Sequence, residues 1–133
     1  MIVVDTNVVA YLLLPGERLR MAEAALTKDA TWLVPRLWRS EFRNVLALYL
    51  RRGQLTLEEA LAVAGEAELL VDGNEYEVSS ATVLRLAALS GCSAYDCEFV
   101  ALAQDFGIKL VTEDGELIRK FPETALSLDA FVA

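Results

Sequence analysis

The first residues of the chain constrain its fold more than any other stretch. Ile2–Val4 is a short run of branched apolar residues, typical of a strand that is buried on both faces in a parallel sheet. Asp5 ends the run, and an apolar, helix-like segment follows from Val8 to Leu14 until Pro15-Gly16 interrupts it. Asp5 therefore lies at the predicted carboxyl edge of a sheet, where open α/β folds place their sites. A simpler interpretation, that Asp5 only caps the first helix, stays open at this point.

The length and composition are typical of a compact protein with one hydrophobic core. The chain has 133 residues, of which 55% are hydrophobic and 24% charged, so we expect a single domain over residues 1–133. No apolar run is long enough to cross a bilayer, and no basic segment precedes the first apolar stretch as in a signal peptide. Cys92 and Cys97 are too few for a disulfide scaffold. We therefore expect a cytoplasmic protein without membrane contact, in which both cysteines are small core residues.

The chain contains no histidine, which excludes several kinds of active site. A Ser-His-Asp or Cys-His nucleophile cannot be built, and zinc sites of the usual His/Cys kind are disfavoured. Acidic residues outnumber basic ones by 20 to 12, giving a net charge of −8, so the chain as a whole has no attraction for nucleic acid. A local cluster of carboxylates can still bind a hard cation.

Short apolar runs alternate with helical patterns along the chain. The sequence predicts strands at 2–4, 31–34, 108–112 and, more weakly, 125–128, and helices at 8–14, 17–28, 37–52, 56–70, 80–89, 94–106 and 114–121. Pro35 is expected to open the helix 37–52, and residues 75–78 are interpreted as an extended connection. The alternation predicts an α/β fold with three layers, α/β/α, and a mostly parallel central sheet. In such a sheet Asp5 and Asp114 lie at the carboxyl ends of neighbouring strands.

Glu41 occupies an unusual position on its predicted helix. On a helical wheel it falls inside a broad apolar arc, between Leu48 and Val45, while the arginines of the same helix lie on the other side. A carboxylate in this position is costly to bury without a partner. Glu41 is therefore half of a buried ion pair with a distant arginine or lysine, a glutamate at the edge of the apolar arc, or a metal ligand that projects into a cleft.

Two further carboxylates have ordinary structural explanations. Ser93 and Asp96 have the spacing of a capping box, so Asp96 could serve only to start its helix. Asp114 has a plain N-cap position after a strand whose carboxyl end carries the hydroxyl of Thr112. Glu98 points away from Asp96 around the helix and is not expected to share its site. Each explanation is reasonable alone. If all of them hold, however, it is a coincidence that Asp5, Glu41, Asp96 and Asp114 all occupy positions from which they could reach one site.

Four segments contain these acidic residues: Val3-Val4-Asp5-Thr6-Asn7, Arg39-Ser40-Glu41-Phe42-Arg43-Asn44-Val45, Tyr95-Asp96 leading into Val100-Ala101-Leu102-Ala103, and Leu110-Val111-Thr112-Glu113-Asp114. In these segments, and in their order, the chain resembles the PIN-domain family, in particular the VapC toxin ribonucleases of toxin–antitoxin pairs. The resemblance spans nearly the whole chain, although residues 53–89 carry no motif. Cys97 and Glu98 depart from it, because such proteins more often have small or apolar residues after the aspartate.

The resemblance implies an endoribonuclease that depends on Mg²⁺ or Mn²⁺. It maps the catalytic and metal-binding carboxylates onto Asp5, Glu41, Asp96 and Asp114, with Thr6, Asn7 and Thr112 as supporting polar groups. The chemistry agrees, because hard divalent cations prefer oxygen ligands and Mg²⁺ keeps several waters. Such ions neutralise a phosphodiester and activate water without histidine. We choose Asp5 and Asp96 as direct ligands.

The resemblance also implies an RNA substrate, a homodimer and a VapB-like antitoxin as partners. Large apolar residues in the first half support an interface, because a small core is not expected to bury all of them: Leu12, Leu13, Leu14, Trp32, Trp38, Phe42, Tyr49 and Leu50. We expect the antitoxin peptide groove near the helix 37–52, and an antitoxin arginine could enter the acidic cleft. Arg36, Arg39 and Arg43 are interpreted as a solvated face or a partner surface.

Two other functions stay open. An Asp-based phosphotransfer domain also uses a strand-end aspartate, but a haloacid-dehalogenase phosphatase has a second aspartate where this chain has Asn7. A receiver domain has a lysine at the end of a strand, whereas Lys109 starts its predicted strand. The second alternative is a non-catalytic binding module with the PIN fold, which nothing in the sequence favours because all four carboxylates are present.

Overall fold

Five parallel strands form the central sheet of the computed structural model, which describes all residues from 1 to 133. The strands are β1 (Ile2–Val4), β2 (Trp32–Pro35), β3 (Glu75–Tyr76), β4 (Leu110–Val111) and β5 (Ala125–Leu126), in the spatial order β3-β2-β1-β4-β5. Every neighbouring pair is parallel. In the central pair, Val3 lies opposite Leu110 and Val4 lies opposite Val111.

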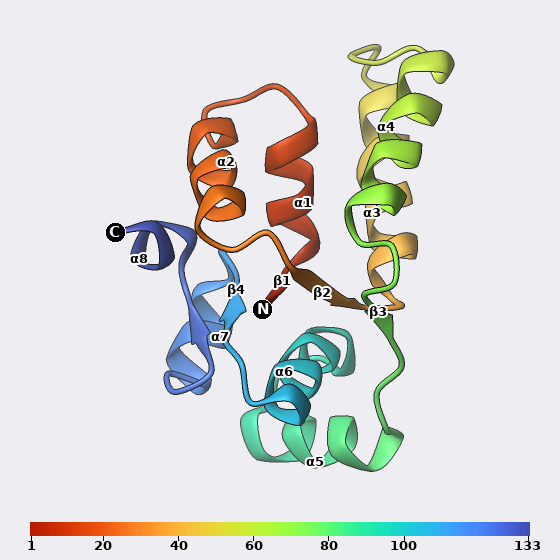
Figure 1. Ribbon diagram of the computed structural model, residues 1–133. Helices are drawn as coiled ribbons and strands as arrows, with labels where there is room; N and C mark the ends of the chain where they lie inside the picture. Colours follow the sequence, from red (N-terminus) through yellow and green to blue (C-terminus); the bar gives the residue numbers. More distant parts are fainter.

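Eight helices connect and cover the strands: α1 (Thr6–Leu13), α2 (Leu19–Lys28), α3 (Trp38–Arg51), α4 (Leu57–Leu70), α5 (Ser80–Ser90), α6 (Ala94–Phe106), α7 (Gly115–Lys120) and α8 (Leu128–Val132). Figure 1 shows α1 and α2 on one side of the sheet and α5 and α6 on the other. The helices α3 and α4 pack against each other next to α1, and α8 packs against α2. The predicted three-layer α/β/α fold with a parallel sheet is thereby confirmed.

One core of 31 buried residues lies around the sheet. It takes up Leu14, Trp32, Trp38 and Phe42, which are at most 4% exposed, whereas Leu12, Leu13, Tyr49 and Leu50 are only partly buried. The expectation that the core does not bury all of these large apolar residues is thereby confirmed. The most exposed large apolar residues lie elsewhere, on α4 and α5 among other places. Both cysteines are buried free thiols, as predicted.

The helices α5 and α6 include many of the apolar residues of the second half. No single helix of the chain is long and apolar enough to cross a membrane, whereas these two together have sufficient length and hydropathy but are bent by 114° relative to each other. Six residues of α6 are buried: Cys97, Phe99, Val100, Ala101, Leu102 and Ala103. The apolar character of α6 is thus accounted for by its place against β1 and β2.

Three local predictions were wrong. Residues 75–78 were interpreted as a connection, but Glu75 and Tyr76 form β3 and pair with Val34 and Pro35. Pro35 accordingly ends β2 and does not open a helix; α3 begins three residues later. The last predicted strand, 125–128, is too long, because Ser127 accepts a hydrogen bond from the backbone of Ala130 and starts α8. A two-residue strand and a five-residue helix contain too few residues to show a period.

Arg39 joins α3 to β3 and is not part of a free basic surface. Its guanidinium donates to both carboxylate oxygens of Glu75, at 2.6 and 2.8 Å, and to Glu68 on α4 at 2.9 Å. The indole of Trp38 donates to Glu75 as well, at 2.7 Å. Because α3 starts without a side-chain cap at Leu37, these bonds fix the first turn of the helix that carries Glu41.

Replacing Glu75 with alanine should lower the free energy of unfolding by about 2 kcal/mol, because charge-assisted hydrogen bonds to Arg39 and to the buried indole are lost. Urea unfolding at pH 7 measures the loss. Glu77→Ala is the matched control, since Glu77 forms a more exposed pair with Arg36 at 3.5 Å, and its loss should stay below about 0.5 kcal/mol. Equal losses in the two variants would contradict this role of Glu75.

Candidate active site

The strand order creates a crevice between β1 and β4. From β1 the chain proceeds outward to β2 and β3, and it later returns to β4 and β5 on the other side of β1. The carboxyl ends of β1 and β4 are therefore the topological switch point, where ligands bind in open α/β sheets. The backbone N–H of Asp5 donates to the carbonyl of Val111 at 3.0 Å. Asp5 and Asp114 thus follow neighbouring strands, as predicted.

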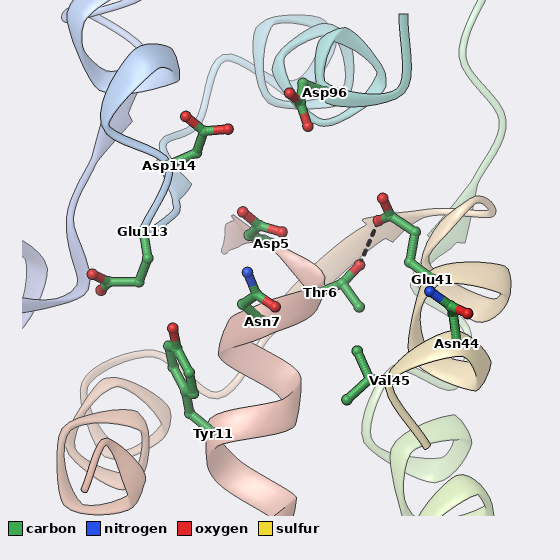
Figure 2. Close-up of a pocket in the computed structure, with 10 residues that line it drawn as sticks. All are labelled: Asp5, Thr6, Asn7, Tyr11, Glu41, Asn44, Val45, Asp96, Glu113 and Asp114. Carbon is green, nitrogen blue, oxygen red and sulfur yellow. Dashed lines mark hydrogen bonds between the residues drawn. The ribbon is translucent and has the colours of Figure 1, made fainter. Parts of the chain in front are cut away.

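A pocket of about 540 Å³ opens at this edge and gathers all four acidic residues singled out in the sequence. Asp5 follows β1, Glu41 comes from α3, Asp96 from the first turn of α6, and Asp114 from the residue before α7. Figure 2 shows the four carboxylates around a common space, with Asp5 in the middle. The other lining residues are Thr6, Asn7, Tyr11, Asn44, Val45 and Glu113.

The carboxylate of Asp5 is held by a hydroxyl and does not cap α1. Although Asp5 is the N-cap residue, its side chain makes no capping hydrogen bond, so the simpler interpretation of this residue is wrong. Its Oδ2 accepts a hydrogen bond from the buried Thr112 hydroxyl at 2.7 Å. The same Thr112 oxygen accepts from the backbone N–H of Asp114 at 3.0 Å. Thr112 therefore couples Asp5 to the turn that carries Asp114.

Glu41 is held in a similar way by Thr6. The hydroxyl of Thr6, which is 4% exposed, donates to Oε1 of Glu41 at 2.8 Å, and Figure 2 shows this bond. Glu41 forms no ion pair within the chain, so the interpretation as a buried ion pair is wrong. It projects from the first turn of α3 into the pocket.

Asp96 lies in the first turn of its helix and Asp114 precedes its helix, and both also line the pocket. The Ser93 hydroxyl accepts from the backbone of Asp96 at 3.1 Å, but the return bond of a capping box is absent, which leaves the Asp96 carboxylate free for the pocket. Asp114 does cap its helix, because Oδ1 accepts from the backbone of Glu116 at 2.9 Å. Its Oδ2 has no partner in the chain. Glu98 lines a different cavity, as the helical wheel predicted.

Sequence reasoning missed Glu113, the fifth carboxylate of the pocket lining. Its Oε1 accepts from Arg18 at 2.7 Å and from the backbone of Leu128 at 3.2 Å. Figure 2 shows its carboxylate directed away from the other four. Arg18 also pairs with Asp129 at 3.2 Å, so it neutralises Glu113 and ties α2 to the last helix. No sequence pattern signalled this long-range pairing.

Tyr11 and Asn44 were missed as well, although a signal existed for both. Tyr11 lies one helical turn after Asn7, and Asn44 lies three residues after Glu41, so each shares a helix face with a predicted site residue. Extending those two faces by one turn would have found them.

Comparison with known proteins places this chain in a family. Residues 2–122 match the family model of the PIN domain. The chain belongs to the PIN-domain family. A relative with 34% identity over 134 residues is Ribonuclease VapC3 from Pyrobaculum aerophilum, with 91% of this chain and 95% of the relative covered. The family resemblance seen in the four acidic segments is thereby confirmed.

Solved structures with low sequence identity share the PIN-domain fold. The crystal structure of PAE2754 from Pyrobaculum aerophilum superposes with a TM-score of 0.77 at 20% identity, over 98% of this chain and 85% of that one. The crystal structure of FitAcB from Neisseria gonorrhoeae gives a TM-score of 0.76 at 17% identity, over 96% and 98% of the two chains.

Burial raises the pKa of three carboxyl groups in the PIN-domain pocket. Desolvation raises the pKa of Asp5 above its ordinary 3.8, although the hydrogen bond from Thr112 opposes the shift. Desolvation also raises the pKa of Glu41, against the hydrogen bond from Thr6 and with help from the charge of Asp5. For Asp96, burial raises the pKa and the charge of Asp114 adds to the shift. The pocket therefore concentrates negative charge at a cost in stability.

The donor atoms of the PIN-domain pocket fit a hard divalent cation that keeps part of its water. Its acidic, amide and hydroxyl side chains offer oxygen ligands, and no lysine or arginine lines it. No group of three His, Cys, Asp or Glu side chains is placed to hold a metal ion by itself. Mg²⁺ needs no such group, because it usually binds one or two carboxylates and retains several waters. The pocket volume of about 540 Å³ leaves room for them.

Replacing Asp5 with asparagine should stabilise the metal-free protein more at pH 7 than at pH 4. A carboxyl group with a raised pKa binds its proton more tightly in the folded state, so its contribution to the free energy of unfolding falls as pH rises through the folded pKa. Asparagine removes this loss and can still accept the hydrogen bond from Thr112. Urea unfolding in EDTA at both pH values measures the difference between variant and wild type.

Asp105→Asn is the control for this measurement, because Asp105 is exposed on α6 and lines none of these cavities. Its effect on stability should not grow with pH in the same way. If Asp5→Asn shifts the free energy of unfolding equally at pH 4 and pH 7, burial does not raise the pKa of Asp5.

Proposed function

We propose that the chain is an endoribonuclease that cleaves RNA phosphodiester bonds with water activated by Mg²⁺ or Mn²⁺. One observation carries the proposal: four carboxylates from four separate elements line a single pocket that no basic side chain lines. Such an arrangement is costly unless a cation compensates it. The relative named Ribonuclease VapC3 supports RNA as the substrate and the toxin of a toxin–antitoxin pair as the biological role.

The residues of the pocket have distinct proposed roles. Asp5 and Asp96 would bind the cation directly, whereas Glu41 and Asp114 would act through water or complete a second site. The cation, when bound, neutralises the phosphate oxygens and makes a water nucleophilic. Thr112 and Thr6 orient the carboxylates of Asp5 and Glu41 by donating to one oxygen of each. Asn7, exposed at the rim of the pocket, would contact the substrate.

Glu41 is the proposed proton acceptor. Its Oε1 is fixed by the hydroxyl of Thr6, while Oε2 makes no hydrogen bond within the chain. Burial raises its pKa, which makes this carboxylate a stronger base than an exposed glutamate. Oε2 would take the proton of the attacking water.

The two alternative functions find less support. A non-catalytic PIN-fold module has no need to gather four carboxylates at a cost in stability, yet the pocket gathers them. An Asp-based phosphotransfer domain needs a lysine near the aspartate, but Lys109 lies at the other end of β4, where it donates to the carbonyl of Glu123.

Asp5→Asn should abolish cleavage of single-stranded RNA while the protein stays folded, because the change removes one charge and very little volume. We expect a loss of at least about 100-fold in kcat/KM, the size of effect seen for groups that act only in the transition state. Cleavage of a labelled RNA in Mg²⁺ measures it, with Asp105→Asn as the charge-matched control on the surface.

Cleavage by the wild type in excess EDTA would show that the reaction needs no metal. Full activity of Asp5→Asn would show that Asp5 is not needed for catalysis. A protein that cuts no RNA, and whose melting temperature does not rise with added Mg²⁺, would be a non-catalytic module.

We also propose two separate protein interfaces, one for an antitoxin and one for a second copy of the chain. Leu12, Leu13, Leu19, Leu26, Leu69 and Leu70 line an apolar groove between α1, α2 and α4. Leu69 is 77% exposed there. We assign this groove to the antitoxin. From the sequence, the antitoxin groove is expected near α3, and α4, which lines this groove, packs against α3. On α5, Leu84 and Leu89 are 61% and 83% exposed, and we assign them to a homodimer.

Leu69→Glu should abolish inhibition by the antitoxin protein and leave the dimer intact, because a charge cannot be buried in an apolar interface. Leu89→Glu should do the reverse and give a monomer. Light scattering and RNA cleavage with and without the protein of the neighbouring gene measure both effects, and each variant is the control for the other. A wild-type monomer at high micromolar concentration would refute the dimer, and unchanged cleavage in the presence of that protein would refute the antitoxin.

A further inference from the structure

A groove continues the acidic pocket along α1 and α3. It is a cavity of about 490 Å³, and three of its lining residues, Asn7, Tyr11 and Val45, also line the acidic pocket. Three other cavities, including the apolar groove between α1, α2 and α4, share no residue with that pocket. The far end of the groove lies at the carboxyl ends of the two helices, where Pro15 and Arg52 line it.

The groove is built from the same helix faces that supply the site. On α1 the residues that line it are spaced by one helical turn, from Asn7 to Tyr11 and on to the buried Leu14. On α3 the face that begins with Glu41 continues through Val45 and on to Arg52. At 1.5 Å per residue, Glu41 and Arg52 are separated by roughly 16 Å along the helix axis. Pocket and groove therefore form one continuous concave surface.

The chemical character changes along this surface. The acidic pocket has no basic residue, whereas the groove contains two arginines, Arg18 and Arg52, against one acidic residue, Glu17. Arg18 is already engaged, with Glu113 and over the ring of Tyr11 at 5.8 Å from its centroid. Arg52 is exposed and forms no ion pair, so its charge is available to a ligand.

Two tyrosines complete the groove. Tyr11 and Tyr49 are both partly exposed and donate no hydrogen bond within the chain. Figure 2 shows the hydroxyl of Tyr11 directed toward the carboxylates of the acidic pocket. Aromatic rings together with arginine, next to a cleavage site, are the features that bind single-stranded nucleic acid by stacking and phosphate contact.

We propose that the groove between α1 and α3 binds the nucleotides of single-stranded RNA that flank the scissile phosphate, with Tyr49 stacking against a base and Arg52 contacting a phosphate. The inference rests on the proposed ribonuclease function and adds the direction in which the substrate leaves the acidic pocket. It also gives a chain with a net charge of −8 an unpaired arginine beside the site for contact with a polyanion.

Charge and composition favour RNA over a peptide as the occupant. Six of the eight residues that line the groove between α1, α2 and α4 are leucines, and the other two, Glu23 and Glu66, are acidic. That surface suits the apolar side chains of a peptide. The groove between α1 and α3 instead offers tyrosines and a free arginine, and it opens directly into the acidic pocket.

Stacking is tested by comparing Tyr49→Leu with Tyr49→Phe, since leucine keeps an apolar side chain in contact with the core and phenylalanine also keeps the ring. With a single strand of about ten nucleotides, Tyr49→Leu should raise KM about ten-fold and leave kcat unchanged, because ground-state binding is lost. Tyr49→Phe should cleave as the wild type does. In the uncleaving Asp5→Asn background, fluorescence anisotropy with the same labelled RNA should show the same ten-fold loss of affinity.

The phosphate contact is tested by salt dependence. Arg52→Gln should reduce the slope of log Kd against log salt concentration by about 0.7, the value expected for one phosphate contact with a single strand. Arg51→Gln is the matched control, because Arg51 is exposed at the adjacent position and does not line the groove. Its slope should equal that of the wild type.

RNA cleavage by the wild type with unchanged affinity and salt slope in Tyr49→Leu and Arg52→Gln would overturn the inference but leave the proposed function intact. Variants that bind RNA normally but no longer respond to the antitoxin protein would overturn it too, and would assign the groove to a peptide. Absence of any cleavage by the wild type would be a separate result, which contradicts the proposed function. In that case the binding measurement still tests the groove: an unchanged RNA affinity of the Asp5→Asn, Tyr49→Leu double variant would exclude it as an RNA-binding surface.

Discussion

Parallel pairing of β1 with β4 brings Asp5 next to Thr112, and the rest of the site depends on that contact. The pairing fixes the register of the two strand ends, so that the Thr112 hydroxyl reaches Asp5 while its oxygen accepts from the backbone of Asp114. A slip of one residue would turn Thr112 to the other face of the sheet. The buried side chain of Thr112 therefore fixes the position of Asp5 relative to the turn that carries Asp114.

The cost of the site is the desolvation of like charges. Asp5, Glu41 and Asp96 all have raised pKa values because burial disfavours their charged forms. Hydrogen bonds, and not cations, oppose the shift at Asp5 and Glu41. The one arginine nearby, Arg18, is used by Glu113 and Asp129. The fold thus leaves the four central carboxylates without a positive partner. Uncompensated charge of this kind is typical of functional sites, where stability is given up for binding.

The sequence predicted the elements with strong local signals. The opening strand and the starts of the helices predicted at 56–70, 80–89 and 94–106 could be predicted because each depends on residues a few positions apart. What could not be predicted depends on distant residues. β3 is a strand only because Val34 and Pro35 lie beside it. The same holds for the site. Glu41 was found from its apolar neighbours on one helix, whereas the orientation of the Glu113 side chain depends on its hydrogen bond from Arg18, 95 residues earlier.

The helix α1 links the surfaces that this fold presents. Asp5 precedes it, Asn7 and Tyr11 lie on the face toward the groove with α3, and Leu12 and Leu13 line the apolar groove on the side of α2 and α4. An antitoxin confined to the leucines would leave the RNA groove open, because the two grooves share only Leu19 among their lining residues. Inhibition would then require an extension of the partner past Leu19 and along α1 toward the acidic pocket. A basic extension would suit that route, since it would meet carboxylates that have no positive partner in the chain. If the two surfaces have these separate roles, binding of an antitoxin and inhibition by it would be distinct properties, which different parts of the partner would supply.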